Sequence, residues 1–228
     1  MKNAVCIYGE MRSFDYQYIN EFYKNFDVFL HTHMTTIDSS VDMQHLFKLK
    51  NLKGLSVDQS EFKYPKHIYN SNNIPISTPN NIAKMLYSIS KSIQLKTNYE
   101  KFHDFEYDKV LIVRNDVSWN KINFSDLFDG IILEDFSWNG NARKDWYMDH
   151  FILTTSRISN KIENFFNYFR INWPEENINF LLPKQNFIAE IIWKNFLDSL
   201  NEQVKFVRFS YDVKAIGGGQ LLKICPEC

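Results

Sequence analysis

Residues 107–119 read YDKVLIVRNDVSW, an apolar run that ends in charged side chains at Arg114 and Asp116. The run over residues 110–113 is typical of a strand covered on both faces, as in a parallel sheet. Side chains two positions apart on a strand share a face. If the strand continues, Arg114 and Asp116 are therefore predicted to point together out of the end of the sheet.

This pair of side chains can bind a phosphorylated ligand. A carboxylate such as that of Asp116 can hold a divalent metal ion, which in turn holds a diphosphate through its oxygen atoms. Arg114 can neutralise the same phosphates directly. The alternative is an Arg–Asp ion pair at the surface just past the strand. Position favours a ligand site, because open α/β sheets bind ligands beyond the carboxyl ends of their strands.

A second strand end carries Gly9 and Arg12 in the stretch YGEMRS. Gly9 can let the backbone approach a phosphate, and Arg12 can pair with that phosphate bidentately. The alternative is a turn glycine and a solvated arginine. Neither the G-x-G-x-x-G pattern nor the P-loop pattern is present, so the turn supports neither Rossmann-type dinucleotide binding nor Walker-type chemistry.

A third strand end reads HTH and places His31 and His33 on one strand face. Two histidines can share a metal ion, but a zinc site needs more ligands than this pair supplies. We expect one histidine to pack at the strand end and the other, His31, to contact the ligand.

A carboxylate and several aromatic side chains stand close together later in the chain. Asp149 opens a predicted strand, after a loop that contains Trp138, Trp146 and Tyr147. Aromatic faces in a loop can pack on the apolar faces of a sugar. The alternative is an aromatic lid that is folded onto the core.

The elements that position these residues alternate between strands and helices. Strands are predicted over residues 5–8, 27–33, 107–119, 130–135, 149–156 and 204–210, with a short one over 53–58. Helices are predicted over residues 14–26, from Thr78-Pro79 to about residue 99, and over 159–169 and 184–200. This alternation predicts one α/β domain over residues 1–228, with a mostly parallel sheet flanked by helices.

The composition excludes several classes of protein. The 228 residues carry a formal net charge of −1 and show no basic block, which argues against a nucleic-acid partner. An aromatic content of 16% argues against disorder. No apolar run is long enough to cross a bilayer, and the first residues do not form a signal peptide. We therefore expect no transmembrane segment and a cytoplasmic location.

The cysteines give little evidence of metal binding or of redox chemistry. Cys6 lies in the first apolar strand and is expected to be buried as a small hydrophobe. Cys225 and Cys228 form a C-x-x-C at the end of the chain, but zinc prefers four ligands and no second pair exists. We expect residues 223–228 to form a loose tail.

Five segments, taken in order, resemble a group of bacterial and viral glycosyltransferases with a GT-A-like fold. The segments are VCIYGEMRSF, FDVFLHTH, KMLYSISKSIQLK, YDKVLIVRNDVSW and DHFILTTS, and the resemblance covers most of residues 4–170. It implies that a nucleotide sugar binds at Gly9, Arg12, Arg114 and Asp116, with acceptor or catalytic groups near Asp149.

The chain departs from this group at two positions. The group usually carries D-x-D, in which two carboxylates meet the metal ion, whereas Arg114 stands at the first of those positions here. A guanidinium can replace part of the charge of an ion, so Mn²⁺ or Mg²⁺ at Asp116 is an open expectation. The tryptophan expected after HT is His33.

The predicted function is therefore transfer of a sugar from a nucleotide-sugar donor to a glycan or another hydroxyl acceptor. Donor binding is assigned to Gly9, Arg12, His31, Arg114 and Asp116. Asp149 is the candidate base for an inverting reaction, and Trp146 and Tyr147 are the candidate acceptor contacts. Two alternatives are a sulfotransferase-like enzyme, which would need a better phosphate loop than GEMRSF, and a nucleotide- or glycan-binding module without catalysis.

Overall fold

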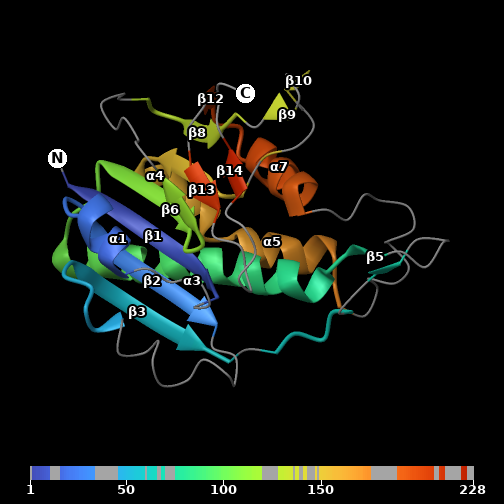
Figure 1. Cartoon of the computed structure of the whole chain (residues 1–228), viewed down its shortest axis with the longest axis horizontal. Coiled ribbons are helices and arrows are strands. Elements are labelled where there is room, and N and C mark those ends of the chain that lie inside the picture. Colours follow the sequence, from blue (N-terminus) through green and yellow to red (C-terminus); the bar gives the residue numbers. More distant parts are fainter. Residues whose placement is uncertain are drawn as a thin grey trace.

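A seven-stranded sheet forms the centre of the computed structural model (Figure 1). The structure describes residues 2–10, 16–33, 46–59, 61–65, 68–69, 75–119, 128–135, 137–138, 141–142, 147, 149–175, 189–207, 211–213 and 222–224. Within these ranges the strand order is β12-β8-β11-β6-β1-β2-β3. The strands are β1 (Asn3–Glu10), β2 (Asp27–His33), β3 (Leu52–Asp58), β6 (Lys109–Arg114), β8 (Ile131–Glu134), β11 (Phe151–Thr154) and β12 (Val204–Val207).

Most strands of this sheet run in the same direction. β1 pairs parallel to both β2 and β6, β2 pairs parallel to β3, and β12 pairs parallel to β8. β11 pairs antiparallel to its two neighbours, β6 and β8, so it alone among the described strands of the sheet runs the opposite way. The predicted single α/β domain with a mostly parallel sheet flanked by helices is confirmed.

Helices cover both faces of the sheet (Figure 1). One face packs against α1 (Tyr16–Phe22), with Ile19 buried beneath it. The other face packs against α3 (Pro79–His103), α4 (Ser156–Ile162), α5 (Phe165–Asn172) and α7 (Ala189–Ser199). Alternate residues of each strand enter the two cores, as the period of two requires, so Cys6 lies on the α3 face and is fully buried, as predicted.

Several predicted boundaries are wrong by a few residues. β1 extends through Gly9 and Glu10, which were predicted to be a turn, because both pair with β2. The helix predicted over residues 159–169 is two helices, α4 and α5. α3 starts at Pro79 as predicted, with Ile82 N–H donating to the Thr78 carbonyl, but the Thr78 side chain makes no cap hydrogen bond.

The strand predicted over residues 107–119 is interrupted. β6 ends at Arg114, Asn115 and Asp116 form a turn, and β7 (Val117–Trp119) begins a different sheet. That sheet has the order β14-β13-β7, where β13 is Tyr211–Val213 and β14 is Leu222–Ile224. The prediction that the strand continues through Asp116 is wrong because the chain leaves the large sheet to pair with β13.

Two further observations concern the loops and the end of the chain. Two short strands, β9 (Ser137–Trp138) and β10 (Asn141–Ala142), lie in the region that was predicted to be a loop before Asp149, and two more, β4 (Ile68–Tyr69) and β5 (Pro75–Ser77), lie between β3 and α3. The first part of the predicted loose tail, Lys223 and Ile224, belongs to β14 and pairs with β13, whereas residues 225–228 lie outside the described ranges.

None of the described helices is long and apolar enough to cross a membrane.

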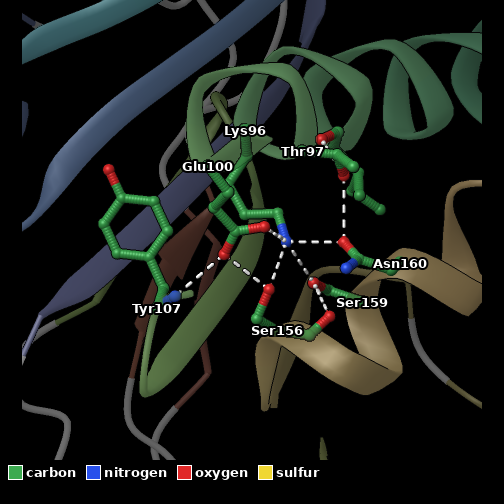
Figure 2. A network of polar contacts seen from close by, with 8 residues as sticks. Lys96, Thr97, Glu100, Tyr107, Ser156, Ser159 and Asn160 are labelled. Atoms are coloured by element: carbon green, nitrogen blue, oxygen red, sulfur yellow. Dashed lines mark hydrogen bonds and ion pairs between the residues drawn. The ribbon is translucent and has the colours of Figure 1, made fainter. Parts of the chain in front are cut away.

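A buried polar network fastens α3 to α4 (Figure 2). Lys96 Nζ lies 2.7–2.9 Å from oxygen atoms of Glu100, Ser156, Ser159 and Asn160. Glu100 also accepts hydrogen bonds from the Ser156 hydroxyl and from the backbone N–H of Tyr107, at the entry to β6. We call these residues the Lys96 network. It lies at the edge of the sheet where β6 begins.

Candidate functional site

Residues at or next to the ends of four strands meet at the edge of the sheet where most of the strands end, and four of these residues have charged or titratable side chains. β1, β6 and β8 bring Gly9, Arg114 and Glu134 to this edge at their carboxyl ends. Because β11 runs the opposite way, its beginning lies at the same edge and brings Asp149 and His150, which directly precede it. The reversed strand thus adds a carboxylate and an imidazole to the edge where α/β sheets bind ligands.

Arg114 and Asp116 do point at each other, although a turn rather than a strand orients them. Arg114 Nε donates to Asp116 Oδ1 at 2.9 Å, and Nη2 donates to Oδ2 at 2.5 Å. The Asp116 side chain is 10% exposed and that of Arg114 is 29% exposed. This bidentate pair is one of the strong hydrogen-bond geometries, so the alternative that the two residues pair with each other has direct structural support.

Asp149 lies between two basic side chains. Its Oδ2 is 3.5 Å from Arg114 Nη1, and its Oδ1 is 3.8 Å from His150 Nε2. The other ring nitrogen of His150, Nδ1, is 3.4 Å from Glu134 Oε2. Glu134, His150, Asp149, Arg114 and Asp116 therefore alternate in charge when His150 is protonated, and we call them the charge row.

Backbone contacts hold the start of β11 against its neighbours. The Tyr8 hydroxyl of β1 donates to the Asp149 carbonyl, and the Arg114 N–H donates to the His150 carbonyl at 3.3 Å. Tyr8 is buried in the core on the α3 face, so its hydroxyl has little freedom to turn away. The positions of Asp149 and His150 are therefore set by two other strands.

The charges of the row alter the pKa values of its basic members. Burial alone would lower the pKa of Arg114, but the carboxylates of Asp149 and Asp116 outweigh it and hold that pKa above its usual range. Burial would likewise lower the pKa of His150, yet the contacts with Glu134 and Asp149 leave it raised above 6.5. The arrangement favours a protonated imidazole.

Gly9 is required at its position for two reasons. Its φ of +128° is a backbone conformation that residues with a side chain rarely adopt. A Cβ placed there would also lie 2.4 Å from Asn115 Oδ1, in the turn after β6. The Asn115 side chain thus packs directly on the Gly9 backbone, where the sequence predicted the approach of a phosphate.

His31 and His33 lie on β2 and are held by other side chains and by the backbone. His31 is fully buried, with Nδ1 3.0 Å from Ser88 Oγ and Nε2 3.1 Å from Asp58 Oδ2. His33 Nε2 donates to the Lys84 carbonyl at 3.2 Å. Burial lowers the pKa of His31 to about 4, despite the opposing effect of Asp58. Packing at the strand end, which was predicted for one histidine, describes both of them.

The aromatic acceptor residues are described only in part. Trp146 and Arg12 lie outside the described residues. Tyr147 is 8% exposed, and its hydroxyl donates to Asp198 Oδ1 of α7 at 2.8 Å. Its ring lies 5.4 Å from that of Phe206, centroid to centroid. The Tyr147 ring is thus packed onto the body of the protein, as the alternative of an aromatic lid describes.

Three acidic or basic residues of this edge were not singled out from the sequence. Glu134 ends β8 in the stretch GIILED, and His150 follows Asp149; the signal available in the sequence is a titratable residue at the end of one predicted strand and at the start of the next. Glu190 lies in the first turn of α7. Burial raises its pKa, and the nearby Asp149 raises it further, whereas Arg114 and His150 act in the opposite direction.

The described residues do not make a metal site around Asp116. None of them gather into a group of three or more His, Cys, Asp or Glu side chains that could hold an ion. Both Asp116 oxygens already accept hydrogen bonds from Arg114, whose guanidinium supplies a positive charge. The participation of Mn²⁺ or Mg²⁺ stays a prediction.

The sheet, its reversed strand and the charge row together define the class of protein: a single α/β domain with charged side chains at the edge where most of its strands end. No family model and no curated protein matches the chain.

Three solved structures share part of the course of the chain. A glycosyltransferase involved in the glycosylation of the major capsid of PBCV-1 aligns with TM-score 0.43 and 10% identity, over 91% of this chain and 82% of its own. A nucleoside-diphosphate-sugar pyrophosphorylase from Vibrio cholerae RC9 aligns with TM-score 0.44 and 7% identity, over 90% of each chain. The galactosyltransferase LgtC aligns with TM-score 0.46 and 10% identity, over 91% and 73%. All three TM-scores lie below 0.5, so the function has to be inferred from the side chains at the sheet edge.

Proposed function

We propose that the protein is a glycosyltransferase of GT-A-like fold that moves a sugar from a nucleotide-sugar donor to a hydroxyl acceptor. The charge row carries this proposal, because it lies at the ligand-binding edge of the sheet and combines a partly exposed guanidinium with a buried carboxylate. The ordered series of motifs that resembles bacterial and viral glycosyltransferases supports the same assignment. β6 ends in Arg114 and β11 begins beside Asp149, as that series requires.

Arg114 is the group that we assign to the leaving diphosphate. A guanidinium has five N–H donors, and the contacts with Asp116 and Asp149 engage three of them. The other two can donate to phosphate oxygens, and Asp116 keeps the fork oriented while they do so. Charge that develops on the leaving diphosphate is then met by a preorganised cation, which is a large term in transfer reactions of this kind. Arg12 is proposed as a second such cation, and Gly9 as a further donor-binding residue.

Asp149 is the group that we assign to the acceptor side. An inverting transfer needs a base for the acceptor hydroxyl, and a carboxylate can act as that base when it lies within hydrogen-bond reach of the hydroxyl. Tyr147 and Trp146 are proposed to border the acceptor. His31 is not offered as a direct contact in this scheme, because its ring is fully buried.

The two alternatives make different demands on the same residues. A sulfotransferase-like enzyme needs a phosphate-binding loop after the first strand, but β1 runs straight through Gly9 and Glu10. A binding module without catalysis needs only Arg114. The tight pairing of Arg114 with Asp116 favours this alternative. We rank the module second for that reason.

The deciding experiment measures hydrolysis and transfer across a panel of nucleotide sugars, with and without Mn²⁺, alongside calorimetric binding. We expect one donor to be turned over and a nucleoside diphosphate to bind. Arg114→Ala should weaken binding of the diphosphate by roughly 100-fold and binding of the free nucleoside much less. Glu202→Gln, at an exposed ion pair with Arg157, is the matched control for loss of a charge.

Each alternative predicts its own result. Binding of the diphosphate without turnover of any donor would identify a binding module. If no donor and no diphosphate binds, the proposed function is excluded. Turnover that requires Mn²⁺ would show that an ion acts beside Arg114, and turnover without it would assign the whole charge to the guanidinium.

A further inference from the structure

The His150 imidazole, like the Arg114 guanidinium, faces two carboxylates of the charge row through different atoms. Nδ1 faces Glu134 at 3.4 Å and Nε2 faces Asp149 at 3.8 Å. A neutral imidazole has a proton on only one of its nitrogens, so its lone pair would face a carboxylate. The imidazolium presents an N–H to each carboxylate and removes that repulsion.

The buried carboxylate of Glu134 needs a nearby positive charge, and His150 can supply it. Its side chain is 2% exposed, and Oε2 makes no hydrogen bond within the usual limits to the described residues, so the ion pair with His150 compensates the charge at that oxygen. An uncompensated buried carboxylate is costly. Glu134 therefore favours a proton on His150, although it lies too deep to reach an acceptor itself.

Asp149 in turn has each of its carboxylate oxygens beside a different cation. Oδ1 faces His150 and Oδ2 faces Arg114, so the plane of the carboxylate is defined from both sides. The loss of one cation frees the carboxylate to rotate. Misplacement of a reacting group by about 1 Å can reduce a rate by about 100-fold.

We propose that His150 is a positioning residue: its imidazolium links Glu134 to Asp149 and thereby fixes the Asp149 carboxylate that receives the acceptor proton. This role rests on the proposed function, because it assigns a task to Asp149 in the transfer reaction. His150 touches neither donor nor acceptor in this scheme and acts through Asp149 alone.

The row makes the reaction sensitive to alkaline pH. Groups from three neighbouring elements influence the His150 ring: Glu134 of β8, Arg114 of β6 and Glu190 of α7, in addition to the adjacent Asp149. The carboxylates favour the imidazolium and Arg114 opposes it, with a raised pKa as the result. Turnover should fall as the pH rises through that pKa, because the neutral ring no longer holds both carboxylates.

The test combines histidine NMR with kinetics on the full chain. The protein contains six histidines, and the signal of His150 is assigned by its loss in His150→Gln. In Glu134→Gln the titration midpoint of His150 should fall by about one pH unit, the shift expected from losing a close charge. The alkaline limb of kcat/KM should move by the same amount. His150→Gln should lower kcat by up to about 100-fold, with little change in the KM for the donor.

The outcomes separate the two proposals. Two results would contradict the claim that the carboxylates of the charge row favour a protonated His150. One is a His150 midpoint that Glu134→Gln leaves unchanged, and the other is a wild-type midpoint below 6.5. A shifted midpoint with an unchanged kinetic profile would exclude the positioning role while the glycosyltransferase assignment stands. A wild type that turns over no donor would exclude the proposed function and the positioning role with it, while the NMR titration would still decide the charge row. Glu202→Gln, far from the row in sequence and paired with the half-exposed side chains of Arg157 and Lys161, should change neither measurement.

Discussion

Lys96 and Arg114 are both bound by carboxylates, and their surroundings differ in almost every respect. Lys96 is fully buried and has four oxygen atoms at 2.7–2.9 Å, three of them from uncharged side chains (Figure 2). Arg114 is 29% exposed and faces two carboxylates, one closely and one at 3.5 Å. The first lies where β6 begins and the second where β6 ends.

The two ends of β6 therefore carry a closed polar cluster and an open one. The Lys96 network is closed: its ammonium has more acceptors than protons, and Glu100 also accepts from Ser156 and from the Tyr107 backbone. The charge row is open, because its separations include 3.4, 3.5 and 3.8 Å and its guanidinium keeps N–H donors for a ligand. A closed buried network stabilises packing, whereas an open one at a ligand edge can bind.

The strongest test of this contrast removes the closed cation. Lys96→Met should lower the free energy of unfolding by about 3–5 kcal/mol, because Glu100 is left charged and buried without its partner. Chemical denaturation measures this loss. The double variant Lys96→Met, Glu100→Gln should recover a large part of it. A loss below about 1 kcal/mol in the single variant would mean that the network contributes little to stability.

The second test removes charge from the open site. Asp149→Asn should reduce donor turnover by about 100-fold, or about 2.7 kcal/mol in transition-state terms. Its effect on unfolding should be clearly smaller than that of Lys96→Met. The same preparation serves for kinetics and for denaturation. A protein that loses stability as severely as Lys96→Met while turnover per folded molecule is retained would reverse the roles of the two clusters.

The third test uses pH, because His31 and His150 are buried histidines whose pKa values are shifted in opposite directions. His31 has a folded pKa of about 4, lowered from 6.5 by burial, so its neutral form is favoured. The contribution of His31 to the free energy of unfolding is therefore fully present above pH 6.5. It falls as the pH drops from 6.5 towards 4, by at most about 1.4 kcal/mol per pH unit. His150, with its raised pKa, contributes stability that is full below pH 6.5 and is lost at higher pH.

Denaturation of wild type, His31→Gln and His150→Gln across this range checks both signs. The acid slope should be weaker in His31→Gln, and the alkaline slope should be weaker in His150→Gln. Equal slopes in all three proteins would show that neither histidine changes its pKa on folding.

The smallest effect is expected at an exposed cluster. Arg157 and Lys161 both contact Glu202 at the surface, and these contacts lower the pKa of Glu202 to about 2. Solvent screening makes such pairs weak. Glu202→Gln should leave the melting temperature within the scatter of replicate measurements at physiological salt. A clear drop would show that ion pairs outside the two clusters also matter for stability.

The sequence predicted the fold class well because the sheet is built from unambiguous apolar runs. Residues 110–113 and 131–133 are buried on both faces, and their composition indicates this directly. The end of β6 could not be predicted in the same way. β7 continues with strand-forming residues, and only its pairing with the distant β13 shows that it has changed sheet.

The sequence singled out part of the cluster at the sheet edge and missed other members of it. Arg114, Asp116 and Asp149 were found because strand ends carry ligands, and the structure brings all three together. Glu134 and His150 were missed because their roles depend on the reversal of β11, which places the start of one strand beside the end of another. His31 was predicted to contact the donor, but it is buried under α3. Its ring nitrogens contact Ser88 and Asp58, which are far from it in the sequence, so the sequence did not indicate this burial.

The reversal of β11 also has a consequence for engineering. β8 ends at Glu134 and β11 begins at Phe151, so the connecting segment leaves and re-enters the sheet at the same edge. A substitute segment need not cross the molecule, and each doubling of its length costs only about 0.6 kcal/mol in chain entropy. The part of this segment that precedes Asp149 is therefore an exchangeable cassette, with Asp149 and His150 kept. Libraries built there should alter acceptor choice while the sheet and the donor half of the site are inherited unchanged.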